Sequence, residues 1–175
     1  MASVVFLRGV NVGGHKRFQP AALAAELADL SAVNIGAAGT FVVRSKVSDK
    51  VLRDRILNLL PFKPEIMICP AAEIVALMSG DPFHGIPLDK SLRAVVTIMS
   101  APAVRPPKLP LYAPDPGKWE VKVVLIEGRA ALSLWRPGDG KILYPNEVIE
   151  KAFHVASTTR SWSTIEKVAR LLGEV

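Results

Sequence analysis

Apolar residues along the first 69 positions follow two patterns, one typical of strands and one typical of helices. Short β-branched runs such as SVVFL predict buried strands, whereas leucines that recur every three or four residues predict amphipathic helices. The predicted elements are, in order, a strand at 3–7, a helix at 20–30, strands at 33–36 and 40–44, a helix between Ser48 and Pro61 with Val51, Leu52, Ile56, Leu59 and Leu60 facing inward, and a strand at 65–69. This β-α-β-β-α-β order is that of a ferredoxin-like plait.

The second half of the chain repeats this order incompletely. A proline-rich segment follows its first strand, where the first half has a helix, and such a segment is expected to be extended. Gly128 marks the turn of a predicted hairpin. The predicted elements are a helix at 70–80, a strand at 93–99, hairpin arms at 120–127 and 129–136, and helices at 145–154 and 163–172.

These elements predict an α+β protein of two ferredoxin-like lobes, of which the second is incomplete and carries extra C-terminal helices. The first lobe is expected at 1–69 and the second at 70–175, either as two lobes or as one compact unit. A chain of 175 residues is long enough to bury a sizeable core without a metal or a disulfide. Cys69 is the only cysteine, which excludes an intrachain disulfide and a multi-cysteine zinc cluster.

Composition places the chain among ordinary globular proteins, with 50% hydrophobic and 22% charged residues. Its apolar runs are shorter than the roughly 18 residues that a membrane span needs, and its start has no basic region typical of a signal peptide. We therefore expect a soluble, cytoplasmic protein that does not associate with membranes. No motif for a cofactor or a metal is present in the sequence.

Basic residues are concentrated at the start of the chain. Residues 1–63 hold nine Lys or Arg and four Asp or Glu, a net charge of +5, out of a net charge of +6 for the whole chain. A basic first lobe would attract anions such as nucleotides, phosphates, nucleic acid or an acidic partner. Aromatic residues make up only 6% and do not alternate with basic residues in a strand, which argues against an RNA-stacking sheet.

The first candidate site is the segment FLRGVNVGGHKRF at residues 6–18, where a buried strand leads into a loop with three glycines. Glycines permit positive φ angles and let backbone N–H groups approach an anion. The candidate ligand-binding residues are Arg8, Asn11, Gly13, Gly14 and Lys16. The spacing matches neither a P-loop nor a dinucleotide fingerprint, so a tight turn is the alternative interpretation.

The second candidate site is the segment STTRSWST at residues 157–164, which precedes the last predicted helix. Thr159 and Arg160 can bind a carboxylate or phosphate, and Trp162 can stack on a ring. In the alternative interpretation Ser161 and Ser163 cap the helix, Trp162 fills the core and Arg160 pairs with an acidic residue.

Two motifs in these segments resemble those of a bacterial family, domain of unknown function 1697. They are LRGVNVGG at residues 7–14 and TTRSWST at residues 158–164. The resemblance covers nearly the whole chain and implies two ferredoxin-like plaits, but it implies no activity. Thr40, Ser161 and Ser163 stand where the family usually has asparagine, which implies weaker amide hydrogen bonding in this member.

The leading hypothesis is a binding protein for a small anion, a nucleotide or a phosphorylated metabolite, with both candidate segments meeting between the lobes. Three alternatives remain open at this point. They are an enzyme that uses His15 or His84 as a general base, a nucleic-acid-binding plait that uses the basic first lobe, and a structural or homodimerising protein.

Overall fold

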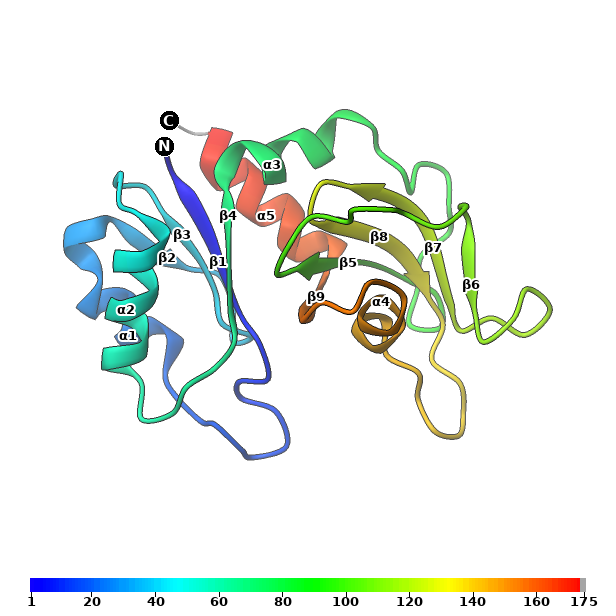
Figure 1. Cartoon of the computed structure of the whole chain (residues 1–175), viewed down its shortest axis with the longest axis horizontal. Helices are drawn as coiled ribbons and strands as arrows, with labels where there is room; N and C mark the ends of the chain where they lie inside the picture. The colour runs from blue at the N-terminus through cyan, green and yellow to red at the C-terminus, as the bar shows by residue number, and fades with distance from the viewer. Residues whose placement is uncertain (174–175) are drawn as a thin grey trace. The chain divides into compact units, whose positions relative to one another are not determined.

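The computed structural model describes residues 1–173. In these residues it contains five α-helices and nine strands, which form two antiparallel sheets (Figure 1). The chain divides into two compact units, Met1–Ala76 with Glu166–Val175 and Leu77–Ile165. The α+β class predicted from the sequence is therefore confirmed.

The first unit contains a four-stranded sheet with the order β2-β3-β1-β4. Every neighbouring pair in this sheet is antiparallel. Its elements are β1 (Ser3–Leu7), α1 (Pro20–Glu26), β2 (Ala32–Asn34), β3 (Thr40–Val43), α2 (Asp49–Leu59), β4 (Ile66–Pro70) and α3 (Ala71–Ala76). The predicted helix at 20–30 is shorter than expected, because a 3-10 turn at Ala28–Leu30 replaces its end.

One face of this sheet packs against α1 and α2, which lie side by side in Figure 1. The helices contribute Leu23 from α1 and Leu52 and Ile56 from α2, and Leu27, the residue that follows α1, is buried with them. Ser48 caps α2 as predicted, since its side chain accepts a hydrogen bond from the backbone N–H of Val51 at 3.3 Å.

Two residues of α2 that were expected to face inward do not. Val51 is 49% exposed and Leu59 is 40% exposed, so both predictions are wrong. Leu52 and Ile56, one turn apart on the helix, are both fully buried. The apolar stripe of α2 is therefore narrower than its composition suggested.

Gly39 enters β3 at a point where no side chain fits. Its carbonyl accepts a hydrogen bond from the backbone N–H of Leu7 at 2.8 Å, and its φ is +72°. A Cβ atom at this position would lie 2.8 Å from the Cβ of Leu7 and 2.9 Å from Cγ2 of Val10. Glycine is required here both for the backbone conformation and for the close approach of β3 to the end of β1.

The second unit contains a five-stranded sheet with the order β6-β7-β8-β5-β9, again antiparallel. Its elements are β5 (Arg93–Met99), β6 (Leu111–Ala113), β7 (Val121–Glu127), β8 (Ala130–Trp135), α4 (Pro145–Phe153), β9 (Ser157–Ser161) and the beginning of α5 (Trp162–Gly173). Helix α4 covers one face, where Val148 and Ile149 pack near Met99, Val121 and Ala131. The segment between β5 and β7 contains no helix, as predicted.

Two strands of this sheet were missed in the sequence. The three-residue β6 lies within the proline-rich segment, and β9 lies within the hydroxyl-rich segment that was expected to lead directly into a helix. Helix α5 begins at Trp162, one residue earlier than predicted. Of the two serines expected as caps, Ser161 fills the role, since its Oγ accepts the backbone N–H of Thr164 at 3.2 Å. β6 has only three residues between prolines, and β9 consists of Ser, Thr and Arg, so neither has the apolar pattern typical of a strand of ordinary length.

The boundary between the units differs from the expected division at residue 70. Helix α3 and the part of α5 from Glu166 onward belong to the first unit. One contact that places α5 there joins Arg44 Nη2 to the carbonyl of Leu171 at 3.1 Å. This hydrogen bond spans more than 120 positions of the chain, so local sequence patterns contain no sign of it.

Among the described residues, no helix is both long and apolar enough to cross a membrane. Within the same residues, no group of three or more His, Cys, Asp or Glu side chains is arranged to hold a metal ion. Cys69 in β4 is buried and forms no disulfide within the described residues.

Candidate functional site

The glycine loop that follows β1 forms a tight hairpin. The backbone N–H of His15 donates to the carbonyl of Val12 at 3.0 Å. The two residues between them, Gly13 and Gly14, have φ angles of +57° and +80°. This geometry is typical of a two-residue type I′ turn, which requires positive φ at both central positions. The turn itself therefore accounts for both glycines.

The side chain of Asn11 connects this hairpin to its surroundings. Its Nδ2 donates to the carbonyl of Ala37 at 3.0 Å, and its Oδ1 accepts from the backbone N–H of Phe18 at 3.0 Å. Asn11 also has a φ of +54°, a conformation that asparagine tolerates better than most residues. Asn11 thus fixes the loop against the connection between β2 and β3.

Two predicted basic residues of the loop differ in their environment. The guanidinium of Arg8 pairs with the carboxylate of Glu65, and the backbone N–H of Arg8 donates to the carbonyl of Glu65 at 2.9 Å. Lys16 is exposed and has a φ of +45°. Arg8 is therefore already engaged with a carboxylate, whereas Lys16 extends into solvent.

Beside the hairpin, the first unit has an open depression of about 950 Å³. Its polar lining includes Asn11, Arg17, Gln19 and Asn34, and the backbone of Gly14 and Gly36 lies among them. A Cβ atom at Gly14 would lie 3.3 Å from Nη2 of Arg17, so the guanidinium lies directly beside the glycine. No carboxylate occurs among the described residues that line this depression.

One atom of Asn34, a residue that lines the depression, lacks a hydrogen-bond partner in the described part of the chain. Its Oδ1 is buried and has no hydrogen-bond partner within residues 1–173. An unsatisfied buried polar atom costs free energy, so such atoms are rare in proteins. The apolar part of the lining includes Phe18, Pro20 and Ala21. The depression thus offers a cation, amides and a small apolar surface.

The second candidate segment lies in a different structural context. Arg160 is in β9 opposite Val96 and is 7% exposed. Its Nη1 donates to Oγ1 of Thr158 at 2.7 Å and to the carbonyl of Thr159 at 2.9 Å. Burial lowers the pKa of Arg160 to about 10, which still leaves the guanidinium protonated at neutral pH.

The neighbours of Arg160 make contacts within the second unit. The hydroxyls of Thr159 and Thr97 are 2.9 Å apart across the β5–β9 pair. The ring of Trp162 meets that of Phe83 edge to face, with centroids 5.3 Å apart. These contacts give both residues a role in packing.

Comparison with known proteins identifies the family of this chain. A model of the family described as "Protein of unknown function (DUF1697)" matches residues 1–124. The chain belongs to the DUF1697 family. The resemblance inferred from the motifs is therefore confirmed. A search of the curated proteins found no match.

One solved structure resembles this DUF1697 chain along nearly its whole length. It is the conserved bacterial protein SP0830 from Streptococcus pneumoniae, which is 17% identical with a TM-score of 0.61. The match covers 98% of each chain. At this identity the likeness shows a shared fold and nothing further.

In this DUF1697 protein, the predicted site residues fall into two groups. Arg8, Asn11, Gly13, Gly14 and Lys16 belong to one loop of the first unit. The remaining three, Thr159, Arg160 and Trp162, belong to the second unit. That all eight contribute to one site stays a prediction.

Of the loop residues predicted to bind the ligand, only Asn11 and Gly14 line the depression. Three of its polar side chains, Arg17, Gln19 and Asn34, were not predicted as site residues. Sequence reasoning also missed a second depression of about 490 Å³ in the second unit, which includes Trp119 and Arg136. Asn11 follows the first predicted strand and Asn34 lies in the second, and these two asparagines could have suggested the first depression. The second requires knowledge of which strands are neighbours, because Trp119 and Arg136 are 17 positions apart.

Proposed function

We propose that this DUF1697 protein binds a small anionic ligand, a nucleotide or a phosphorylated metabolite, in the depression beside the glycine loop. The observation that carries the proposal is an exposed Arg17 among amide side chains, with no carboxylate among the described lining residues. A guanidinium in this setting favours phosphate or carboxylate oxygens, because it can donate two parallel hydrogen bonds.

The side-chain amides supply the second part of the proposal. Gln19 and Asn34 can donate to phosphate oxygens or to the polar atoms of a sugar or base. Asn11 is less available, since both ends of its amide already contact the backbone. The small apolar surface around Phe18 suits the remainder of an organic phosphate better than a bare inorganic ion.

The proposal is confined to binding. His15 is exposed and is not among the residues that line the depression. His84 is also exposed and lies in the second unit, where its Nδ1 is 3.3 Å from Oδ2 of Asp81. That Thr159, Arg160 and Trp162 also contact the ligand stays a prediction from the sequence, and it has its own test.

Calorimetric titration of the full chain tests this proposal. The probes are inorganic phosphate, a sugar phosphate, adenosine monophosphate and adenosine triphosphate. We expect at least one organic phosphate to bind, and we expect Arg17→Gln to weaken it about tenfold or more, which corresponds to about 1.4 kcal/mol. Lys46→Gln is the matched control, since Lys46 is an exposed cation of the same unit outside the depression.

Two outcomes would contradict the proposal. One is that none of the four probes binds to the unmodified protein. The other is equal weakening by Arg17→Gln and Lys46→Gln, which would indicate a general effect of charge. A separate loss of binding in Thr159→Val would support a contribution from the second segment.

We also infer that both units are ferredoxin-like plaits. The element order β1-α1-β2-β3-α2-β4 and the sheet order β2-β3-β1-β4 support this for the first unit. In the second unit, β9-β5-β8-β7 follows the same order, without a helix after β5 and with β6 added at the edge. We also infer a cytoplasmic location, with which a chain that has a single cysteine and therefore no intrachain disulfide is consistent.

A further inference from the structure

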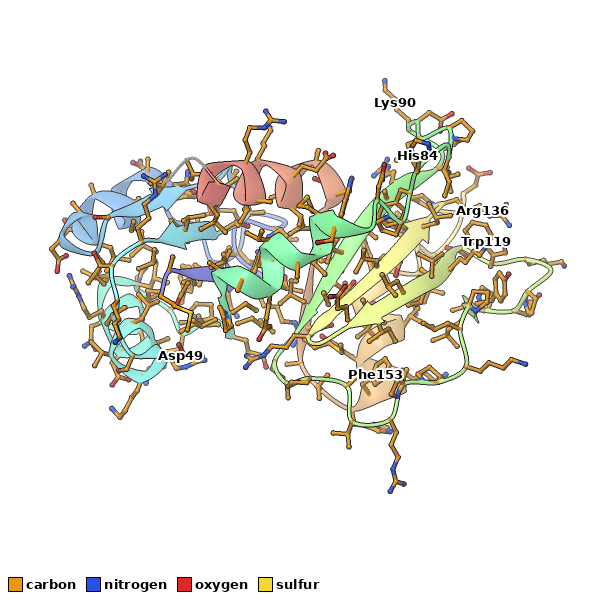
Figure 2. The ribbon with its side chains drawn as sticks, turned by 90° about the horizontal axis from the view of Figure 1, so that it is seen from above. Asp49, His84, Lys90, Trp119, Arg136 and Phe153 are labelled. Carbon is orange, nitrogen blue, oxygen red and sulfur yellow. The ribbon has the colours of Figure 1, made fainter. Side chains whose placement is uncertain are left out.

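Three cations on the sheet of the second unit lie over aromatic rings. The guanidinium carbon of Arg136 is 3.9 Å from the centre of the Trp119 ring, and Nζ of Lys122 is 5.6 Å from that of Tyr112. Arg93 lies over Trp135 at 5.4 Å. Figure 2 shows Arg136 and Trp119 next to one another beside the yellow strands of this unit.

Two of these pairs join into one continuous row. The rings of Tyr112 and Trp119 have centroids 6.4 Å apart and are tilted by 54°. Lys122, Tyr112, Trp119 and Arg136 therefore follow one another, with a cation at each end and two rings between them. We call this group the cation–aromatic row. Its rings are half-buried, which leaves part of their surface open to a ligand.

Backbone pairing fixes the row in place. Tyr112 is opposite Lys122 in the β6–β7 pair, so both side chains lie on the same face of the sheet. Arg136 follows β8 directly, and its Nε donates to the carbonyl of Trp119 at 2.6 Å. The row is thus held by strand register at one end and by a side-chain hydrogen bond at the other. Because these side chains are already positioned, a ligand would bind with little loss of side-chain conformational entropy.

The cations of the row are not neutralised by carboxylates. Within residues 1–173, none of Lys118, Lys122 and Arg136 forms an ion pair. The nearby carboxylates instead accept backbone N–H groups. Asp115 accepts those of Gly117 and Lys118 at 2.9 and 3.0 Å.

Glu120 is engaged in the same way. Its Oε2 accepts the backbone N–H groups of Gly138 and Leu143 at 3.4 and 3.2 Å. This carboxylate therefore stabilises the loop after β8. The cations beside it keep their capacity to bind an external anion.

The row borders the depression of about 490 Å³ in this unit, whose lining includes Ser91, Lys118, Trp119, Arg136 and Gly138. We infer that the cation–aromatic row binds single-stranded nucleic acid. Bases stack on the exposed parts of Tyr112 and Trp119 and on the guanidinium plane of Arg136, while Lys118 and Lys122 contact phosphates. This inference is independent of the proposed small-anion site, which uses other residues in the other unit.

The positions of the cations favour an oligonucleotide over a free nucleotide. Lys122 lies at one end of the aromatic pair, whereas Lys118 and Arg136 lie at the other. A mononucleotide places its phosphate at one end only, whereas successive nucleotides place phosphates at both. An acidic peptide would contact the cations but would leave the two rings unused.

Fluorescence anisotropy of the full chain with a labelled twelve-nucleotide oligouridine tests the inference. Trp119→Leu is expected to weaken binding about tenfold, because base–aromatic stacking makes a large contribution to such complexes. Trp119→Phe keeps a ring at this position and should retain most of the affinity. The conservative pair separates stacking from a general packing effect.

Charge variants give a second, independent readout. Lys118→Gln should weaken binding and lower the slope of log K against log salt by about one, as expected for the loss of one phosphate contact. Lys151→Gln is the control, since Lys151 is an exposed cation of α4 in the same unit. Lys118 is exposed and is not one of the three cations that lie over rings in the described residues, so this variant remains informative if Trp119→Leu does not fold.

Several results would overturn the inference. These are no binding of the oligonucleotide, equal affinity for uridine monophosphate or polyglutamate, or equal affinity of the Lys118 and Lys151 variants. Arg17→Gln distinguishes this site from the small-anion site, because it should leave oligonucleotide binding unchanged. Loss of oligonucleotide binding in Arg17→Gln alone would assign nucleic acid to the first unit and overturn the inference.

Discussion

The two units have the same number of basic residues and the same number of acidic residues, but the surroundings of their cations differ. Each has eleven Lys or Arg and eight Asp or Glu in its sequence, a net charge of +3. In the first unit three of the cations, Arg8, Lys50 and Arg55, pair with carboxylates. In the second unit three lie over aromatic rings.

This difference follows from where the aromatic residues occur. All three Trp and both Tyr residues belong to the second unit, whereas the first unit has only Phe among its aromatics. A cation over a ring keeps its charge available, while a cation in an ion pair is largely neutralised. Equal net charge therefore does not mean equal capacity to bind a polyanion.

The largest expected effects test whether the units have independent cores. Ile56 in the first unit and Ile149 in the second are both fully buried, so Ile56→Ala and Ile149→Ala should each lower the free energy of unfolding by about 3 kcal/mol. Hydrogen exchange measured by mass spectrometry should show the loss of protection mainly in the unit that carries the substitution. Equal losses in both units for both variants would show that the chain unfolds as one body.

A pair of glycines tests the packing of the first unit at a single position. Gly39 and Gly36 have nearly the same φ, +72° and +74°, but only Gly39 has neighbours that a Cβ would meet. Gly39→Ala should cost about 3 kcal/mol from strain and overpacking, whereas Gly36→Ala should cost about 1 kcal/mol from backbone strain alone. Urea denaturation measures both. Similar costs would mean that the contacts with Leu7 and Val10 relax freely.

Two arginines of the second unit should behave differently from one another. Arg160 is buried and donates to Thr158 and Thr159, so Arg160→Ala should lower the free energy of unfolding by about 2 kcal/mol. Arg136 is exposed, and Arg136→Ala should cost less than about 1 kcal/mol. Thermal unfolding monitored by circular dichroism distinguishes the two. A larger loss for Arg136→Ala would contradict the role of Arg160 in the fold.

The smallest effect concerns an exposed ion pair of the first unit. Hydrogen bonds from Arg55 at 2.6 and 2.9 Å lower the pKa of Asp29 below its usual 3.8. The stabilisation by this pair is therefore present above pH 3.8 and is lost as the pH falls through the lower pKa of the folded state. Arg55→Gln should consequently lower the unfolding temperature slightly at pH 6 and less at pH 3.

Arg53 provides the control for that pH dependence. Its Nη1 donates to the carbonyl of Ile66 at 2.7 Å, and a carbonyl does not titrate in this range. The difference between the wild-type chain and Arg53→Gln should be the same at pH 6 and pH 3. A pH-dependent difference for Arg53→Gln would mean that the effect of Arg55→Gln does not report on Asp29.

The candidate sites were only partly predictable from the sequence. The loop at residues 6–18 was found because glycines and basic residues occur there in succession. Its depression also depends on Asn34, which ends β2, and β3 lies between β2 and β1 in the sheet. The cation–aromatic row was not found at all. Tyr112 and Lys122 are ten positions apart, and only the register of β6 and β7 makes them neighbours.

The sequence by itself determined the elements whose signals are local. β1 and β5 have the bounds that their β-branched runs predicted, Ser48 caps α2, and Gly128 with a φ of +56° turns the hairpin between β7 and β8. Each depends on residues within a few positions of one another. The tertiary structure alone decided the pairing of β9 with β5, the place of β6 and the unit to which the end of α5 belongs. These three features depend on contacts between segments that are distant in the sequence. The free energy of such contacts depends on both surfaces that meet, so the residues of one segment alone do not predict it.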